Sequence, residues 1–448
     1  MTEALQSLLA DVEASAPFAW HRGRTVSRAE FLTDVEHLAS RLPASTHVIN
    51  VCRQRYAFIV AFVAAVLRGQ VSLLSHDGTL RTMEQLRRRY PGVYEATDDP
   101  ALAAENRAVY VDACGANGST ARYPPPMPLD RVLAVTFTSG TTGEPTPHEK
   151  TLRALRGCAR LYVGELRLPA DGGSVVATVP PQHMYGFEAA TLVPLTTRIV
   201  VHSGHPLYPH DVRVALREVP QPRVLVTTPI HLRALVGAGE DLPTTDVIIC
   251  AAAPLARSLA AEAEARFAAR VMEVYGCTEA GLVATRRTTE GDLWTLPAGV
   301  SMTIDGERAS IESKHAGRVP LQDSIERVSA REFRLLGRGA DLVNIAGKRA
   351  SLAGLDAILM EIDGVLDAGV FLSESERDER EPRLSAVVVA PTLTASDVKR
   401  ELRNRIDAAF IPRDVYVVAT LPRDRTGKLK RAALVEIARE RRAARHEA

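Results

Sequence analysis

Few cysteines occur in this sequence, and nothing in their arrangement gives them a common role. There are 5 in 448 residues, and no two of them form a Cys-x-x-Cys pair. Because their number is odd and their spacing is irregular, the sequence excludes a disulfide framework and a cysteine zinc site. Scattered single thiols of this kind are typical of the reducing cytoplasm.

Charge of one sign is not in excess either. The 55 lysines and arginines are balanced by 54 aspartates and glutamates, which leaves a formal net charge of +1. No global basic field therefore exists to hold nucleic acid or an anionic membrane by counterion release, so an anion-binding site must be local. Basic and aromatic residues are not interleaved, and a nucleic-acid-binding protein is the class with least support.

Long apolar segments are absent. The longest apolar run, Tyr56–Leu67, covers about 12 residues and ends at Arg68, whereas a membrane-spanning helix needs about 20. The N-terminus, Met1-Thr2-Glu3-Ala4, has neither the basic start nor the apolar core of a signal peptide. We therefore expect no membrane span and a cytoplasmic location.

What the sequence does contain is the composition and rhythm of a layered globular protein. Hydrophobic residues make up 46% and charged residues 24%, which excludes a disordered chain. Helical periodicity covers residues 28–42, 55–68 and 82–90, and strand-like runs cover 48–52, 70–76, 132–137, 174–180, 198–202, 223–228 and 247–251. The apolarity of these runs is continuous, as in strands covered on both faces. The pattern predicts an α/β fold with a large N-terminal layered domain built on parallel sheets.

A second unit is predicted toward the C-terminus. The composition changes near residues 331–341, and beyond it we expect helices at 351–362 and 395–410 and strands at 365–371, 384–390 and 415–419. We therefore assign residues 1–336 to the N-terminal domain, 337–341 to a hinge and 342–448 to a small, mobile C-terminal α+β domain. Residues 115–128 and 374–383 are expected to be loops.

The strongest motif follows directly after the predicted strand 132–137. Residues 136–145 read TFTSGTTGEP, so two glycines lie among several hydroxyl side chains. Such a loop can fold tightly and direct N–H and O–H donors at one point, as a polyphosphate requires. It is not a Walker loop, because the GxxxxGK[ST] spacing is missing. Taken alone, an exposed hairpin would be the better interpretation.

Three further stretches carry polar residues suited to nucleotide chemistry. Residues 275–281 read YGCTEAG, in which Glu279 can ligate Mg²⁺ through oxygen while Thr278 donates to a phosphate. The glycines on either side allow a ligand to approach the backbone. Residues 337–341 (GRGAD) lie at the predicted domain boundary, and residues 423–428 (RDRTGK) lie near the C-terminus.

In this order and spacing, the four stretches resemble the adenylate-forming superfamily of acyl-CoA synthetases, aryl-acid ligases, luciferases and nonribosomal adenylation domains. The resemblance extends from about residue 132 to about residue 434. It implies that ATP, with Mg²⁺, and a carboxylic acid give an acyl-adenylate. The acyl group then passes to a phosphopantetheine thiol after the small domain rotates.

The resemblance also implies roles for individual residues. Lys428 is the lysine that the small domain inserts during adenylation, Thr278 contacts the α-phosphate and Glu279 holds the metal. The implied ATP- and AMP-binding set is Thr138, Ser139, Gly140, Thr141, Thr142, Gly143, Lys150, Ala252, Ala253, Pro254, Tyr275, Gly276, Asp323 and Arg338. Within it, the tyrosine packs beside adenine, and the aspartate and the arginine contact the ribose.

The implied acyl pocket combines the segment 180–186 with several strand ends. Its residues are His183, Tyr185, Gly186, Thr228, Ala251, Cys277 and Gly281. Small side chains on its walls leave a flat slot that suits an aromatic ring. His183, which is also a candidate catalytic residue, and Tyr185 are polar enough to orient a carboxylate or to meet a ring hydroxyl. Cys277 is interpreted as a pocket wall, because no base partners its thiol in the sequence.

Three positions depart from the superfamily pattern. Thr146 stands where the phosphate loop normally has a lysine, and we expect Lys150 to replace it. Ala340 occupies a hinge position that usually carries a charged residue, and Ala251 replaces the glycine of a pocket-wall motif. The first change bears on phosphate affinity, the second on the energetics of domain rotation and the third on the shape of the pocket.

A narrower similarity concerns the substrate. The phosphate-loop variant, together with residues 180–188 (PPQHMYGFE), is similar to the short ligases of aryl-polyene and xanthomonadin-type pigment synthesis. That similarity implies 3- or 4-hydroxybenzoate as the acid and an acyl carrier protein as the acceptor. Two alternatives stay open: an aryl- or acyl-CoA ligase that uses free coenzyme A, and a catalytically lapsed nucleotide-binding module.

Overall fold

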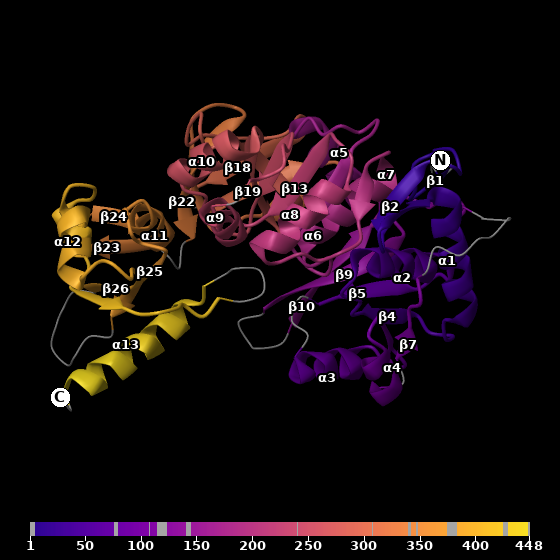
Figure 1. The fold of residues 1–448 in the computed structure, drawn as a ribbon, viewed down its shortest axis with the longest axis horizontal. Helices are drawn as coiled ribbons and strands as arrows, with labels where there is room; N and C mark the ends of the chain where they lie inside the picture. Colours follow the sequence, from indigo (N-terminus) through magenta and orange to yellow (C-terminus); the bar gives the residue numbers. More distant parts are fainter. Residues whose placement is uncertain are drawn as a thin grey trace.

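Two large sheets with helices on their faces are followed by a small C-terminal unit (Figure 1). The computed structural model describes residues 5–75, 79–106, 108–113, 123–139, 145–239, 241–306, 308–338, 342–345, 348–373, 383–423 and 429–446. The arrangement confirms the predicted fold class. The exact boundaries of the domains and the hinge stay predictions.

The first sheet has six strands in the order β10-β9-β5-β4-β6-β7. These are β4 (His47–Asn50), β5 (Val71–Leu74), β6 (Tyr94–Thr97), β7 (Val109–Tyr110), β9 (Val132–Ser139) and β10 (Pro145–Thr151). Neighbouring strands are parallel except β9 and β10, which form an antiparallel hairpin. The phosphate-loop motif of the sequence therefore begins in β9 and reaches the first residue of β10, and its residues 140–144 lie outside the described residues.

The second sheet has eleven strands in the order β21-β22-β17-β16-β15-β14-β13-β11-β12-β2-β3. These are β2 (Pro17–His21), β3 (Arg24–Ser27), β11 (Ser174–Ala177), β12 (Val200–His202), β13 (Arg223–Thr227), β14 (Val247–Cys250), β15 (Arg270–Cys277), β16 (Gly281–Arg286), β17 (Trp294–Thr295), β21 (Asp323–Arg327) and β22 (Glu332–Arg338). The strands from β2 to β15 are parallel, and the outer ones are antiparallel. The carboxyl ends of the parallel strands meet at one edge of the sheet, where ligands bind in open α/β sheets.

Helices fill the space between the sheets and cover their outer faces. They are α1 (Arg28–Arg41), α2 (Arg55–Leu67), α3 (Leu80–Arg89), α4 (Pro100–Asn106), α5 (Leu152–Glu165), α6 (Met184–Phe187), the π-helix η1 (Glu188–Leu192), α7 (Val193–Thr196), α8 (Pro209–Glu218), α9 (Pro229–Gly237) and α10 (Arg257–Phe267). One core joins Val48 of the first sheet to Val175 of the second through α1, α2, α5 and α7. Their strand neighbours point outward, Ile49 toward α3 and Val176 toward α8–α10. This alternation produces layers with strands buried on both faces.

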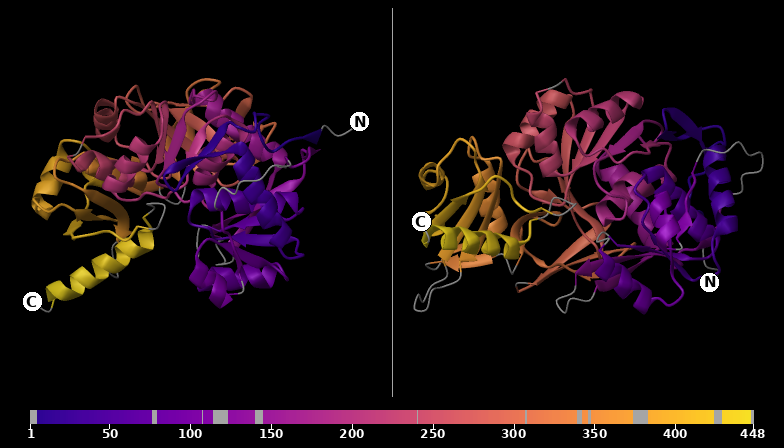
Figure 2. Two further views of the ribbon diagram at one scale, coloured as in Figure 1. Left: turned by 45° about the vertical axis from the view of Figure 1, so that its right-hand side comes forward. Right: turned by 60° about the horizontal axis from the view of Figure 1, so that its bottom comes forward.

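Small antiparallel sheets complete the chain. They are formed by β1 (Leu5–Gln6) with β8 (Met127–Pro128), by β18 (Val300–Asp305), β19 (Arg308–Ser313) and β20 (Gly317–Pro320), and by β23 (Leu342–Ile345) with β24 (Lys348–Ser351). The C-terminal unit adds β25 (Asp367–Ser373), β26 (Arg383–Val389), β27 (Asp414–Val417), α11 (Leu352–Met360), α12 (Ala395–Arg403) and α13 (Arg431–His446). It has its own hydrophobic core and lies at one end of the molecule, beyond β22 (Figures 1 and 2).

The expected helices and strands are present, with ends that differ by a few residues. The helix expected at 395–410 is shorter: it ends at Arg403, and a short 3-10 helix follows at Ala408–Phe410. The antiparallel strands between 281 and 338 are an additional finding, because a strand as short as Trp294–Thr295 leaves no periodicity in the sequence. Residues 115–122 and 374–382 of the expected loops lie outside the described residues. No helix in the part of the chain that the structure describes is both long and apolar enough to cross a membrane.

The C-terminal end of α10 provides a test of the backbone geometry. Ala268 caps this helix with φ 50° and ψ 40°, the left-handed region that favours glycine. We expect Ala268→Gly to raise the free energy of unfolding by about 1 kcal/mol, because the strain on Cβ is removed. Ala261→Gly in the exposed middle of the same helix should lower it by about 1 kcal/mol. Thermal or denaturant unfolding measures both, and a destabilised Ala268→Gly variant would contradict the geometry.

Candidate functional site

The turn between β15 and β16 carries the Thr278-Glu279 pair. Cys277 and Gly281 pair across it in the antiparallel ladder, and residues 278–280 form the turn. Gly281 has φ 75°, and a Cβ added there would lie 2.2 Å from Glu188 Oε1. A Cβ on Gly276 would lie 2.6 Å from the carbonyl oxygen of Gly281. Both glycines are therefore required by close packing, which explains why the motif is flanked by them.

The β9–β10 hairpin meets this turn through His148. Thr138 Oγ1 lies 2.9 Å from His148 Nε2, and the same nitrogen lies 3.6 Å from Glu279 Oε1. Burial lowers the pKa of His148, and the positive charge of Lys150 acts in the same direction, while Glu279 opposes them. A mainly neutral imidazole thus links two motifs that are distant in the sequence. Gly140, Thr141, Thr142 and Gly143 lie outside the described residues, as does the side chain of Ser139.

Lys150 occupies a different place from the one expected. Its side chain is 3% exposed, and its ammonium donates to the carbonyl oxygen of Thr278 and, at 2.9 Å, to that of Glu279. These contacts correct the expectation that Lys150 replaces the missing loop lysine at the phosphates. The buried cation instead holds the backbone of the Thr278-Glu279 turn.

The predicted nucleotide residues Tyr275 and Asp323 are in direct contact. The hydroxyl of Tyr275 donates to Asp323 Oδ2 over 2.7 Å. In the β21–β22 ladder, Asp323 is the register partner of Arg338, whose side chain lies outside the described set. The ring of Tyr275 packs 5.7 Å from that of Trp294. The structure therefore brings together three residues that the sequence separates by more than 60 positions (275 to 338).

The ends of the strands beside the Thr278-Glu279 turn carry the small residues that are predicted to line the acyl pocket. Ala251 and Thr228 are 5% and 1% exposed, and each directly follows its strand, β14 and β13, after the last ladder pair, Cys250 and Thr227. Ala252 has φ 76°, a left-handed conformation that is costly for a residue with a Cβ. Ala253 is half-buried and Pro254 is exposed. Strain of this kind is concentrated at functional sites, where the surrounding structure enforces it.

The segment 180–187 is the second part of the predicted acyl pocket. His183 is half-buried at the start of α6, where Phe187 N–H donates to its carbonyl oxygen over 2.8 Å. Gly186 packs on Pro180, whose carbonyl oxygen would lie 2.2 Å from an added Cβ. The hydroxyl of Tyr185 is buried and lies 2.8 Å from the carbonyl oxygen of Ile249. The expectation that this hydroxyl meets the substrate is therefore corrected, because it bonds to the sheet.

Cys277 is a poor candidate for a nucleophile, and its place in the wall of an acyl pocket stays a prediction. Burial raises the pKa of its thiol to about 12, and the charge of Glu279 acts in the same direction. A thiol with so high a pKa is a poor nucleophile at neutral pH.

Lys428 and Ala340 lie outside the described residues. The base of the segment that carries Lys428 is described: Arg423 and Leu429 form an antiparallel bridge, and Arg423 pairs with Asp367 at 2.6 Å. On the neighbouring α9 of the large domain, the pKa of Arg233 is lowered by burial, and the charges of Asp367 and Arg423 act on it. Arg423, just before this segment, is therefore held by Asp367 and lies near Arg233 of α9.

Sequence reasoning assigned no role to His148, Asp367 or Glu188. Glu188 is a carboxylate in an otherwise apolar helical segment, a signal that could have been noticed. The positions of His148 and Asp367 depend on strand register, which leaves no signal in the sequence.

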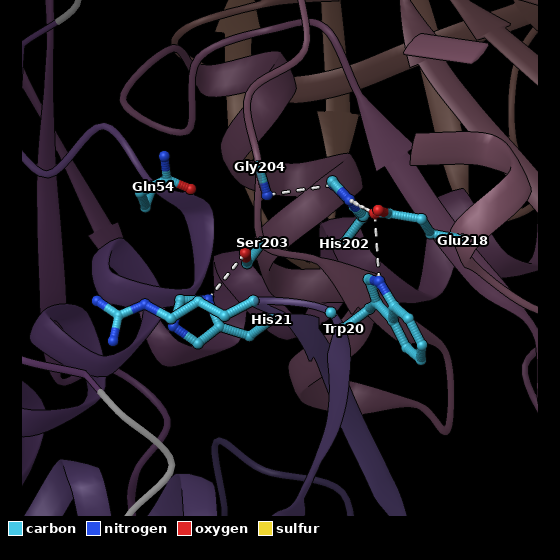
Figure 3. A pocket seen from close by; sticks show the side chains of 9 residues that line it. Trp20, His21, Gln54, His202, Ser203, Gly204 and Glu218 are labelled. Atoms are coloured by element: carbon cyan, nitrogen blue, oxygen red, sulfur yellow. Dashed lines mark hydrogen bonds and ion pairs between the residues drawn. The ribbon is translucent and has the colours of Figure 1, made fainter. Parts of the chain in front are cut away.

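A separate cavity of about 380 Å³ opens near β2 and β12 (Figure 3). Its polar groups bind one another: Glu218 Oε2 accepts from Trp20 Nε1 at 3.2 Å and lies 3.1 Å from His202 Nε2. It contains none of the predicted site residues.

Comparisons with known proteins agree with this geometry. Residues 9–323 match the AMP-binding enzyme family, and residues 354–428 match the AMP-binding enzyme C-terminal domain. A 4-coumarate–CoA ligase of Rhodobacter capsulatus is 27% identical over 303 residues, which cover 66% of this chain and 74% of the relative. A 3,4-dihydroxybenzoate–[aryl-carrier protein] ligase of Bacillus anthracis is 21% identical over 309 residues, which cover 66% of this chain and 72% of the relative.

A solved structure shares the fold over nearly the whole chain. The o-succinylbenzoate CoA synthetase from Bacillus subtilis, in complex with its acyl-adenylate intermediate, superposes with a TM-score of 0.80 at 18% identity and covers 97% of this chain and 98% of its own. The family matches cover most of the large domain and part of the small unit. The chain therefore belongs to the AMP-binding enzyme family of adenylate-forming acid–thiol ligases.

Proposed function

We propose that this chain activates a hydroxybenzoate, or a related aryl acid, as its acyl-adenylate and transfers the acyl group to the phosphopantetheine thiol of an acyl carrier protein. The observation that carries adenylation is the meeting of Thr138, the Thr278-Glu279 turn and the Tyr275–Asp323 pair at one sheet edge. The aryl acid is supported by the small side chains beside that edge and by relatives that act on 4-coumarate and 3,4-dihydroxybenzoate.

In the first step, a carboxylate oxygen of the acid attacks the α-phosphorus of ATP. A new P–O bond forms, the bond to the β-phosphate oxygen breaks, and pyrophosphate leaves. Thr278 and the hydroxyls of the β9–β10 hairpin donate hydrogen bonds to the phosphates, where negative charge accumulates. His148 holds Thr138 in place, and Lys150 fixes the backbone that carries Thr278.

Glu279 fits a magnesium site. Its carboxylate is 37% exposed and its backbone is held by Lys150, so it can offer oxygen to a cation bound between protein and phosphates. Mg²⁺ commonly uses one or two carboxylates together with substrate phosphates, and when bound it neutralises part of the phosphate charge.

In the second step, the small unit turns and withdraws Lys428, so that a thiol reaches the acyl-adenylate. The sulfur adds to the acyl carbon, the bond to the AMP oxygen breaks, and a thioester and AMP result. A carrier-protein thiol is favoured here because one relative is an aryl-carrier protein ligase. Coenzyme A is the second candidate, because other relatives are CoA ligases.

Acid-dependent exchange of labelled pyrophosphate into ATP tests the function directly. We expect exchange with hydroxybenzoates and not with long fatty acids. Mass spectrometry of a holo carrier protein, in competition with coenzyme A, then identifies the acceptor. Failure of exchange with every acid would favour a catalytically lapsed nucleotide-binding module. The observation that suggests such a module is the threonine at position 146, where the family's phosphate loop normally has a lysine.

Lys428→Ala separates the two half-reactions. We expect adenylation to fall by at least about 100-fold, because a charge that stabilises the transition state is lost, while transfer from a supplied acyl-adenylate is kept. Lys430→Ala, an exposed neighbour, is the matched control and should leave both steps unchanged. Equal loss of both half-reactions in Lys428→Ala would contradict the alternating role of the small domain.

Lys150→Met tests whether this lysine positions the turn or contacts ATP. Without the ammonium, the carbonyl oxygens of Thr278 and Glu279 lose their donor, which costs about 1–3 kcal/mol of stability. We expect kcat for exchange to fall at least tenfold together with this loss of stability. Glu149→Gln, on the exposed face of the same strand, should change neither. A raised KM for ATP with unchanged stability and kcat would instead indicate direct phosphate contact.

A further inference from the structure

Glu188 is a buried carboxyl group to which the mechanism above gives no role. It begins η1, a π-helical turn within a helical segment that runs from Met184 to Thr196. It is 2% exposed, and its neighbours Phe187 and Ala189 are buried apolar residues. A carboxyl group is costly to bury without partners, and π-turns are frequent at functional sites.

The surroundings of Glu188 leave part of its carboxyl group without a donor. Cys158 and Tyr162, one turn apart on α5, approach it and lower its pKa, as does the charge of Lys150. Burial outweighs them and raises the pKa to about 7. Despite these neighbours, Oε1 has no hydrogen bond of normal geometry to any described residue. Buried acceptors are normally satisfied, so this oxygen is suited to accept from a group that the free protein does not contain.

The position of Oε1 places it at the proposed acyl pocket. It lies 2.2 Å from the point where Gly281 would carry a Cβ, and Gly281 follows the Thr278-Glu279 turn directly. Cys158 Sγ lies 2.5 Å from the same point. Gly281 is one of the residues that the family resemblance assigns to the acyl pocket. The carboxyl group of Glu188 therefore packs on the pocket wall, beside the turn that binds the phosphates.

A purely structural role as the counter-charge of Lys150 is less well supported. The lysine directs its hydrogen bonds to the carbonyl oxygens of Thr278 and Glu279, and it acts on Glu188 through its charge. If Glu188 served only as the counter-charge of Lys150, there would be no reason for its Oε1 to lack a hydrogen-bond donor among the described residues. A ligand that brings its own hydroxyl group satisfies this oxygen and leaves the lysine contacts intact.

We propose that Glu188 accepts a hydrogen bond from a hydroxyl group on the ring of the aryl acid and so selects phenolic acids over unsubstituted ones. This inference rests on the proposed function, since it concerns the acyl pocket of that reaction. A site built to bond a hydroxyl group discriminates strongly against an analogue without one, because the buried acceptor is then left unpaired. Glu188 is a specificity-determining residue, and the adenylation chemistry itself does not need it.

The test compares hydroxybenzoates with benzoate in wild type, Glu188→Leu and Glu188→Gln. In pyrophosphate exchange, we expect wild type to prefer 3- or 4-hydroxybenzoate over benzoate. Glu188→Leu should reduce this ratio of kcat/KM values by about 10- to 100-fold, through loss of activity on the hydroxylated acid and with benzoate kept. Glu188→Gln, which keeps an acceptor oxygen, should lie between them. The Leu variant is expected to fold, because its side chain is apolar among apolar neighbours.

Thr191→Val is the matched control. It removes from the same π-turn another buried oxygen that has no hydrogen-bond partner among the described residues, and it should leave the ratio unchanged. Calorimetric titration of each acid into wild type and Glu188→Leu repeats the comparison without turnover. Equal losses for both acids in Glu188→Leu, or a wild-type enzyme that treats both acids alike, would overturn the inference and leave the proposed function standing. If no aryl acid supports exchange and none binds, both the inference and the proposed function are overturned.

Discussion

The site depends on one buried cation that joins the two large sheets. Lys150 belongs to β10 of the six-stranded sheet, and the carbonyl groups that it binds belong to the turn after β15 of the eleven-stranded sheet. A buried ammonium must find acceptors, and here the acceptors are backbone oxygens of Thr278 and Glu279. The two halves of the proposed nucleotide site are thereby fixed relative to each other. His148 adds a second connection from the same strand, on the solvent side of the lysine.

The surrounding layers make this connection rigid. Both sheets pack on the same helices, so a shift of one sheet would disturb the core of the other. Thr278 and Glu279, which we propose to be catalytic, follow the end of a strand in these sheets, and the glycines at 276 and 281 allow the backbone to pack at distances that no side chain permits. A site built on regular elements in this way is preorganised, which is what a reaction between two anions requires.

Sequence patterns predicted much of this structure, and the reasons are physical. Continuous apolar runs identified the parallel strands, because those strands are buried on both faces. The motif at 275–281 indicated a tight turn, which the structure places at residues 278–280. The burial of Lys150 was not predictable, since it depends on the register of β10 against β9 and on the distance between two sheets. The π-turn at Glu188 has no periodic signal. The hydroxyl of Tyr185 was assigned to the substrate because it is polar. Its bond to the carbonyl oxygen of Ile249 was not predictable, since Ile249 belongs to a strand more than 60 residues away (185 to 249).

Gly337 gives the molecule a further property. It is the last but one residue of β22 and has φ 108°, and an added Cβ would lie 2.2 Å from the side-chain oxygen of Ser351, which caps α11. At this point, the side chain of Ser351 in the small unit thus packs directly against the backbone of Gly337. In the proposed rotation of the small unit, this close contact would be lost as a whole, and the unit would move between discrete orientations. The balance between such orientations would then depend on a contact that includes no substrate atom, and a methyl group added at Gly337 would shift it.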